Sequence, residues 1–284
     1  MHLSSWQNSG PYYDHHGHQI FYRTAGQGEA LLLIHGFPTA SWDWHKVWAQ
    51  LSNRYQLIAA DMIGFGFSDK PRTYNYSIHD QADLQEGLLQ SLGIKRYHIL
   101  AHDYGDTVAQ ELLARQLEGA AKAEILSVAF LNGGLFPGNH QPRLIQKLLA
   151  SPLGFLIKRF VNKAKLRSNF QAIFGPNTQP TAQEIEEFWA LNTHNDGIGI
   201  VHKLIRYMHE RVRFEKRWLG ALQDTAVPLQ LINGGFDPIS GRHMAEKYQE
   251  VVPNPQVVVL DQVGHYPQVE APQEVLSAYF QQQA

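Results

Sequence analysis

The sequence predicts an α/β fold in which a mostly parallel sheet is flanked by helices. Apolar stretches typical of buried strands alternate with helical patterns in the first and last parts of the chain. This alternation stops between residues 140 and 222, where the pattern is helical and is interrupted by prolines and glycines. We therefore predict a core formed by residues 1–139 and 223–284, and an inserted helical lid, or cap, formed by residues 140–222.

The expected strands and helices follow one another in the order that a parallel sheet requires. Strands are expected at residues 18–24, 30–34, 56–60, 97–100, 125–131, 228–232 and 256–260. Helices are expected at residues 42–51, 78–92, 107–117 and 272–281. Because parallel strands end at one edge of a sheet, residues that directly follow the strands are the candidates for a common site.

The composition describes a globular chain of 284 residues, of which 44% are hydrophobic and none is Cys. The lack of Cys excludes disulfides and thiolate metal sites, and together with the absence of a signal-peptide pattern it favours a cytoplasmic location. The apolar stretch at residues 144–161 contains basic residues and a proline, so it is not expected to span a membrane. Histidines crowd residues 14–18, but this predicted N-terminal turn lies away from the strand ends, and we expect no metal site.

A sharp turn that carries one reactive side chain is expected at Ala101–Asp106, between a strand and a helix. The pattern is typical of a nucleophile elbow, in which a tight turn pushes one side chain out of the sheet beside backbone N–H groups. Here the central residue is Asp103, and a carboxylate is ionised at neutral pH without the help of a base. An ordinary polar turn is the alternative. We predict that Asp103 is a nucleophile directed at a strained or activated carbon.

Two further candidates, Asp237 and His265, also follow predicted strands. The order along the chain is nucleophile, acid and base, and a parallel sheet would bring all three to its carboxyl edge. A turn with the residues His35 to Pro38 follows another predicted strand, and the N–H after its glycine can complete an oxyanion site. Together these residues predict hydrolytic chemistry, whereas each alone would fit an ordinary turn.

No cofactor is expected. Gly64 and Gly66 lack the G-x-G-x-x-G spacing of dinucleotide-binding loops, and the segment continues to Lys70 and Pro71 instead of opening a helix. We therefore predict neither NAD nor FAD. The expected partner is a small apolar or amphiphilic substrate and not a nucleic acid, and the oligomeric state is left open.

The chain resembles the α/β-hydrolase superfamily, in the branch with an aspartate nucleophile that contains epoxide hydrolases and haloalkane dehalogenases. Within that branch it is most similar to the mesoderm-specific transcript hydrolases. The similarity extends over nearly the whole chain, and it rests on the motifs His35–Thr39, Gly64–Pro71, His102–Asp106, Asn132–Gly134, Asn195–Gly197 and Arg217–Leu222. It implies an α/β-hydrolase fold with an eight-stranded sheet.

The resemblance also implies roles for individual residues. Asp103 would attack carbon to form an alkyl ester, and His265, oriented by Asp237, would activate the water that hydrolyses this ester. The backbone N–H groups of Phe37 and Tyr104 would stabilise the tetrahedral intermediate. His35, in the same turn as Phe37, is included among the expected binding residues.

The leaving group stays open between three chemistries. An epoxide leaves as an alkoxide that needs an acid, and epoxide hydrolases use lid tyrosines, for which Tyr207 is in the expected place. A halide would instead need donors around it, and Tyr104 and Phe37 stand where dehalogenases carry side-chain N–H groups. Tyr104 together with a lid tryptophan, Trp189 or Trp218, would then have to hold the halide. β-Lactone hydrolysis is the third chemistry. We expect epoxide hydrolysis first, and the complete triad argues against a protein that only binds.

The predicted lid is basic. Residues 140–170 contain seven Lys and Arg but no Asp or Glu, and these basic residues are interleaved with large apolar ones. Such a segment either covers the pocket with its apolar face or makes a weak, salt-sensitive contact with an anionic membrane surface. The sequence favours the first interpretation, since charges on a lid ordinarily meet water or the acidic core.

Overall fold

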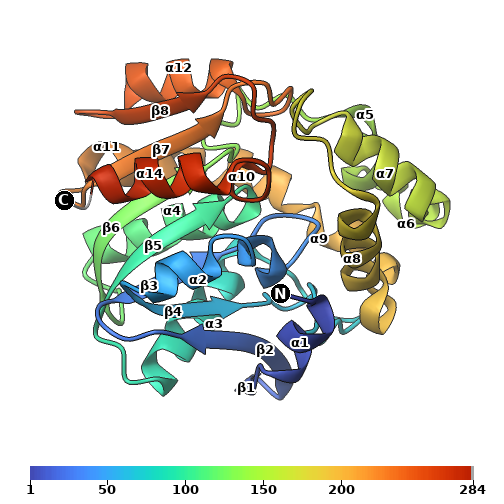
Figure 1. Ribbon diagram of the computed structural model, residues 1–284, viewed down its shortest axis with the longest axis horizontal. Helices are drawn as coiled ribbons and strands as arrows, with labels where there is room; N and C mark the ends of the chain where they lie inside the picture. Colours follow the sequence, from blue (N-terminus) through green and yellow to red (C-terminus); the bar gives the residue numbers. More distant parts are fainter. Residues whose placement is uncertain (283–284) are drawn as a thin grey trace.

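An eight-stranded sheet runs through the centre of the computed structural model, which describes residues 1–282 (Figure 1). The strand order is β1-β2-β4-β3-β5-β6-β7-β8. Strands β1 and β2 pair antiparallel, as do β2 and β4, and all other pairs are parallel. The strands are β1 (Tyr12–His15), β2 (His18–Ala25), β3 (Ala30–Ile34), β4 (Gln56–Ala60), β5 (Arg96–His102), β6 (Glu124–Leu131), β7 (Leu229–Gly234) and β8 (Gln256–Leu260). The predicted mostly parallel sheet is confirmed.

Helices cover both faces of this sheet and form the insertion between β6 and β7 (Figure 1). The helices outside the insertion are α1 (Leu3–Asn8), η1 (Ser41–Trp44), α2 (Trp48–Ser52), α3 (Ile78–Ser91), α4 (Tyr104–Leu117), α12 (Arg242–Val251), α13 (Pro267–Glu270) and α14 (Pro272–Gln282). Those of the insertion are α5 (Leu144–Ala150), α6 (Gly154–Ile157), η2 (Lys158–Phe160), α7 (Lys163–Gln171), α8 (Ala182–Thr193), η3 (His194–Gly199), α9 (Val201–Leu204), α10 (Tyr207–Arg213) and α11 (Glu215–Asp224). Side-chain caps begin three of these helices, where Ser77, Asn162 and Thr181 accept hydrogen bonds from free backbone N–H groups.

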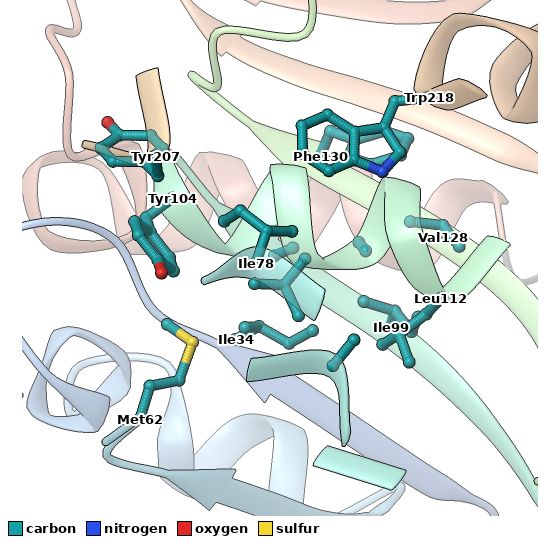
Figure 2. Packing of buried hydrophobic residues seen from close by; sticks show 14 of the residues in the cluster. Ile34, Met62, Ile78, Ile99, Tyr104, Leu112, Val128, Phe130, Tyr207 and Trp218 are labelled. Atoms are coloured by element: carbon teal, nitrogen blue, oxygen red, sulfur yellow. The ribbon is translucent and has the colours of Figure 1, made fainter. Parts of the chain in front are cut away.

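The central strand β3 is buried on both faces because its side chains alternate between two apolar clusters. Leu31 and Leu33 pack with the tryptophans of α1, η1 and α2 and with α14. Leu32 and Ile34 pack on the opposite face with α3, α4 and α11. Figure 2 shows this second cluster, in which Trp218 of α11 lies over the sheet. The burial of both faces explains why β3 reads as a continuous apolar stretch.

The expectation of a single helix at residues 42–51 is wrong. The structure has a 3₁₀ turn, η1, followed by the short helix α2. Trp42 and Trp44 are both buried, and residues two apart in an α-helix cannot share one face. Ser41 also donates to the buried Asp61 carboxylate through its N–H and its hydroxyl group. Burial of the two indoles therefore prevents one continuous helix here.

The insertion divides into two parts. One part consists of helices α5, α6 and α7, which lie away from the sheet on the right of the molecule in Figure 1. Helix α11 packs against α4 of the core, where the Trp218 indole N–H donates to Glu111 at 2.9 Å. No helix among residues 1–282 is long and apolar enough to cross a membrane.

Candidate active site

The predicted elbow lies between β5 and α4, and Asp103 is its turning residue. Its backbone has φ 47° and ψ −99°, a region that non-glycine residues rarely adopt. The helix that follows packs closely on β3, since a Cβ on Gly105 would lie 2.3 Å from the Ile34 carbonyl oxygen. The neighbours of β3 in the sheet are β4 and β5, so the turn sits where the strand order reverses. Ligands bind at such positions in open α/β sheets.

The Asp103 carboxylate is buried among donors and positive charge. The Phe37 backbone N–H donates to Oδ2 at 3.1 Å, and the Arg211 guanidinium lies 3.6 Å from Oδ1. Tyr104 is the first residue of α4, so its N–H has no acceptor within the helix. Burial alone would raise the pKa of Asp103, but the charges of His265 and Arg211 hold it below its usual value. Asp103 is therefore an ionised carboxylate with Oδ2 in the oxyanion position.

The acid and base of the predicted triad are in direct contact. His265 Nδ1 and Asp237 Oδ2 are 2.7 Å apart, and both residues are buried. The other contacts of Asp237 come from the N–H of Ile239, the N–H and hydroxyl of Ser240, and the side-chain amide of Asn132. Burial opposes the charge on both partners, but their contact lowers the pKa of Asp237 to about 2 and raises that of His265 to about 9. The raised pKa favours the protonated imidazole, whose positive charge helps to lower the pKa of Asp103.

The loop that carries His265 is tied to the lid by Glu270. This carboxylate accepts the N–H groups of Gly264 and Tyr266 in the catalytic loop and that of Gly175 in the insertion. In addition, the His265 N–H donates to the carbonyl oxygen of Ile173 at 2.8 Å. The base is thus positioned by the insertion as well as by the core.

His35 does not contact the substrate cavity, contrary to the expectation for it. Its Nδ1–H donates to the Gly36 carbonyl at 2.9 Å, and its Nε2 accepts the Met62 N–H at 3.0 Å. Burial lowers the pKa of His35 to about 4, so the ring is neutral. Since both ring nitrogens are occupied by the backbone, His35 supports the turn that presents the Phe37 N–H.

The Tyr207 ring lies next to that of Tyr104, the residue that follows Asp103 (Figure 2). The two ring centroids are 4.5 Å apart, and the Arg211 guanidinium lies 4.5 Å from the Tyr207 ring. Burial and the negative charge of Asp103 raise the pKa of Tyr207. The phenol therefore stays protonated and can act as a hydrogen-bond or proton donor near the carboxylate.

None of the candidate aromatic donors, Tyr207 included, belongs to the residues that line the cavity described below. Trp189 is half-buried on α8 and packs against the cluster around Phe188 without lining the cavity. Trp218 belongs to the core, where Glu111 accepts its indole N–H. The Tyr104 ring is buried beneath the site, so its contribution is limited to the backbone N–H. The Trp218 indole N–H is therefore occupied and is not free to bind a halide at Asp103.

A cavity of about 450 Å³ connects the site to the lid. Its buried end is lined by Phe37, His265 and Tyr266. Its outer end is lined by Leu144 and Phe160, whose side chains are largely exposed. Most of the remaining lining is apolar and comes from the insertion, including Ile145, Leu149, Val161, Leu166, Val201 and Ile205. This lining suits an apolar molecule that enters between the lid helices.

Arg211 is the functional residue that sequence reasoning missed. Its Nη2 donates to the Asp103 carbonyl oxygen at 2.9 Å, and its Nε donates to the Thr107 hydroxyl at 2.7 Å. Gly134 makes room for the guanidinium, since a Cβ there would lie 2.2 Å from Nη1. One signal in the sequence could have found it. Arg211 lies four residues after Tyr207, and residues four apart share one face of a helix.

The crowded N-terminal histidines lie away from this site. His15, His16 and Asp80 place potential ligand atoms within 4.8 Å of one another, on β1 and α3. Three strands separate β1 from β5 in the sheet. This group has no part in the geometry around the nucleophile.

An aspartate elbow, an Asp–His pair and an oxyanion N–H at the carboxyl edge of this sheet define an α/β hydrolase. The family model described as the alpha/beta hydrolase fold matches residues 29–272, and the chain belongs to that family. The family expected from the sequence motifs is confirmed.

Two relatives are similar to almost the whole of this chain. It is 41% identical over 289 residues to the mesoderm-specific transcript protein of Mus musculus, an alignment that covers 98% of this chain and 86% of that protein. It is 36% identical over 277 residues to the putative hydrolase LipZ of Mycobacterium tuberculosis, which covers 97% of this chain and 96% of the relative. The predicted resemblance to the mesoderm-specific transcript hydrolases is therefore confirmed.

Solved structures share the fold at lower identity. The epoxide hydrolase CorEH superposes with a TM-score of 0.78 at 21% identity and covers 96% of this chain and 97% of its own. The haloalkane dehalogenase DbeA of Bradyrhizobium elkani superposes with a TM-score of 0.80 at 21% identity, with the same coverage of 96% and 97%. At this identity the likeness shows the fold alone.

Proposed function

We propose that this hydrolase opens epoxides through an ester formed on Asp103. The observation that carries the proposal is the buried Tyr207 phenol near Asp103, whose negative charge, together with burial, raises the pKa of that phenol. Epoxide opening needs both groups, because the carbon is attacked by a nucleophile while the departing alkoxide takes up a proton. The apolar cavity that ends at His265 supports an apolar or amphiphilic epoxide as the substrate.

In the first step, Asp103 Oδ1 forms a bond to an epoxide carbon and the C–O bond of the ring breaks. The resulting alkoxide takes the proton of the Tyr207 phenol, and the phenolate is reprotonated from water. Oδ2 keeps its hydrogen bond from the Phe37 N–H during this step. Arg211 keeps Asp103 ionised before the attack.

In the second step, His265 acts as the base for a water molecule that attacks the ester carbon of Asp103. Esterification removes the carboxylate charge, which is one of the causes of the raised pKa of His265, so the pKa falls and the imidazole can release its proton. The N–H groups of Phe37 and Tyr104 stabilise the tetrahedral oxyanion. Its collapse breaks the bond to the departing oxygen, which takes the proton from His265 and leaves as the diol. The Asp103 carboxylic acid then gives the second proton of the water to His265, which restores the ionised carboxylate.

A panel of substrates tests this proposal. Epoxides, bromoalkanes and β-lactones of matched carbon skeleton are offered to the wild type and to Tyr207→Phe, and diol, bromide and hydroxy acid are measured. We expect diol from the epoxides and a slowing of the alkylation step by about 100-fold or more in Tyr207→Phe, the usual scale of general acid catalysis. Tyr248→Phe, which changes another buried tyrosine on α12, is the matched control and should leave the rate unchanged.

The other outcomes are informative. Equal epoxide turnover by the wild type and Tyr207→Phe would mean that Tyr207 only packs. Bromide release without diol formation would identify a dehalogenase, and selective lactone opening would identify the third chemistry.

A further inference from the structure

An apolar surface covers the outer part of the lid. Six of the eleven large hydrophobic side chains that are exposed among residues 1–282 lie within residues 144–160. Leu144, Leu153 and Phe160 are more than half exposed, at 72%, 60% and 61%. We call the following set the lid face: Leu144, Leu148, Leu153, Phe155, Leu156 and Phe160. Large exposed apolar side chains gathered in one segment indicate an interaction surface, whereas single ones scattered over a protein need no explanation.

The chain segment that contains the lid face carries only positive charge. From residue 125 to residue 183 the chain has no Asp or Glu. Among the basic side chains of this stretch, Lys163 pairs with Glu186. Four others are exposed and make no ion pair with any part of the chain that the structure describes: Lys147, Arg159, Lys165 and Arg167. These four charges therefore meet water and do not attach the lid to the acidic core.

The lid face continues into the mouth of the cavity. Leu144, Leu148 and Phe160 belong to the lid face and also line the cavity that ends at His265. In Figure 1, the segment from α5 to α7 lies outermost on one side of the molecule, so no other element stands in front of it. A partner that covers the lid face would therefore also meet the entrance to the active site.

We propose that the lid face docks on an anionic lipid bilayer, with the cavity mouth turned toward the membrane. Exposed leucines and phenylalanines can enter the boundary between headgroups and acyl chains, while the surrounding Lys and Arg attract anionic headgroups. A symmetric contact between two copies would instead place one basic surface against another, which opposes association. The docked hydrolase receives amphiphilic substrates directly from the bilayer, a consequence that rests on the proposed function, whereas the docking itself does not.

Co-sedimentation of the whole chain with vesicles tests the docking. Vesicles of phosphatidylcholine alone are compared with vesicles that also contain phosphatidylglycerol. We expect binding only to the anionic vesicles at an ionic strength of about 0.01 M, where the Debye length is about 30 Å, and its loss at about 1 M, where that length is about 3 Å.

Variants with matched controls locate the surface. Arg159→Glu and Lys147→Glu should each weaken binding about fivefold or more, since one basic charge near an anionic surface contributes about that factor. Phe155→Ser should weaken binding without changing the charge. The controls are Lys95→Glu, at the opposite edge of the sheet before β5, and Leu117→Ser, an exposed apolar residue of α4; both should bind like the wild type. None of these five residues lines the cavity, so turnover of a water-soluble substrate should be unchanged.

Three results would overturn the proposal. The first is no preference for anionic vesicles at low ionic strength. The second is unchanged binding of the Arg159 and Phe155 variants, or an equal loss in the two controls. The third is a dimer in light scattering that Phe155→Ser breaks, which would mean that a second copy covers the lid face. Failure of epoxide turnover alone would leave the vesicle binding intact, so the two proposals fail separately.

Discussion

The guanidinium of Arg211, in the lid, donates to the backbone carbonyl oxygen of Asp103 at 2.9 Å and lies 3.6 Å from its carboxylate. One side chain of the insertion therefore contacts both the backbone of Asp103 and its carboxylate. A second bond to Thr107 fixes the guanidinium on the first turn of α4. The lid therefore supplies a side chain that stabilises the turn at Asp103, in addition to covering the cavity.

Replacing Arg211 by Met should raise the pKa of Asp103, because the nearby positive charge that stabilises the carboxylate is removed. The acid limb of the alkylation rate should move to higher pH, as measured by rapid quench across a pH series. Arg211→Lys should restore the pH profile in part, since Lys keeps the charge but cannot bridge Asp103 and Thr107. The matched control is Arg213→Met, an exposed residue of the same helix.

The Arg211→Met variant should also be less stable than the wild type, because Asp103 loses its buried charge partner. We expect its free energy of unfolding, measured with urea, to be lower by about 3 kcal/mol. An unchanged pH profile in a folded Arg211→Met variant would limit this residue to a structural role.

The ester mechanism predicts the origin of the oxygen in the product. Water attacks the carbonyl carbon of the ester, so the oxygen that leaves with the product comes from Asp103. In one turnover in ¹⁸O-labelled water, the product should be unlabelled and the Asp103 peptide should carry the label, as read by mass spectrometry. Label in the product of the first turnover would show direct attack by water on the substrate.

His265→Gln should let the ester form and accumulate, because only the water step needs a base. Asp103→Asn should form no ester, since a neutral amide lacks the nucleophilic carboxylate. His209→Gln, an exposed residue of α10, is the control and should turn over normally. Turnover near the wild-type rate in both His265→Gln and Asp103→Asn would refute the mechanism.

The Asp237–His265 pair should make stability depend on pH. The folded pKa of His265 is raised from 6.5 to about 9, so its contribution is complete below pH 6.5 and is lost as the pH rises through about 9. The folded pKa of Asp237 is lowered from 3.8 to about 2, so its contribution is present above pH 3.8 and is lost as the pH falls through about 2.

Asp237→Asn should accordingly be less stable than the wild type by about 3 kcal/mol between these two limits. The difference should shrink above pH 9, when His265 has lost its proton. Urea unfolding of both proteins in this range and above pH 9 checks the prediction. A difference that stays constant with pH would mean that the loss comes from the other hydrogen bonds of Asp237.

Asp106 should destabilise the fold at neutral pH. It is fully buried, and burial together with the negative charge of Asp103 raises its pKa well above 3.8. A carboxyl whose folded pKa is raised loses stability as the pH rises above its unfolded value. Asp106→Asn should therefore be more stable than the wild type by on the order of 1 kcal/mol at neutral pH, with the gain vanishing below pH 3.8.

Thermal unfolding at the two pH values measures the effect of Asp106→Asn. Asp224→Asn, an exposed substitution at the end of α11, is its control and should show no such gain. A loss of stability at neutral pH would mean that the Asp106 carboxylate is ionised and stabilised in the fold.

Local patterns in the sequence were enough to predict the sheet, the sharp turn at Asp103 and the pairing of Asp237 with His265. Apolar stretches and their bounding turns are short-range features, and parallel strands must bring Asp103, Asp237 and His265 to one edge. The same reasoning failed at residues 42–51. Trp42 and Trp44 are both buried there, and the sequence does not say against which parts of the fold they pack.

Contacts between distant segments were decided only by the tertiary structure. Arg211 reaches Asp103 across 108 residues, and Glu270 reaches Gly175 across 95, so neither contact has a local signature. His35 follows a strand as a functional residue would, but the backbone occupies both of its ring nitrogens. The sequence by itself determined which residues lie at the edge of the sheet, whereas packing of the lid on the core determined which of them face the cavity, because side-chain direction follows from long-range contacts.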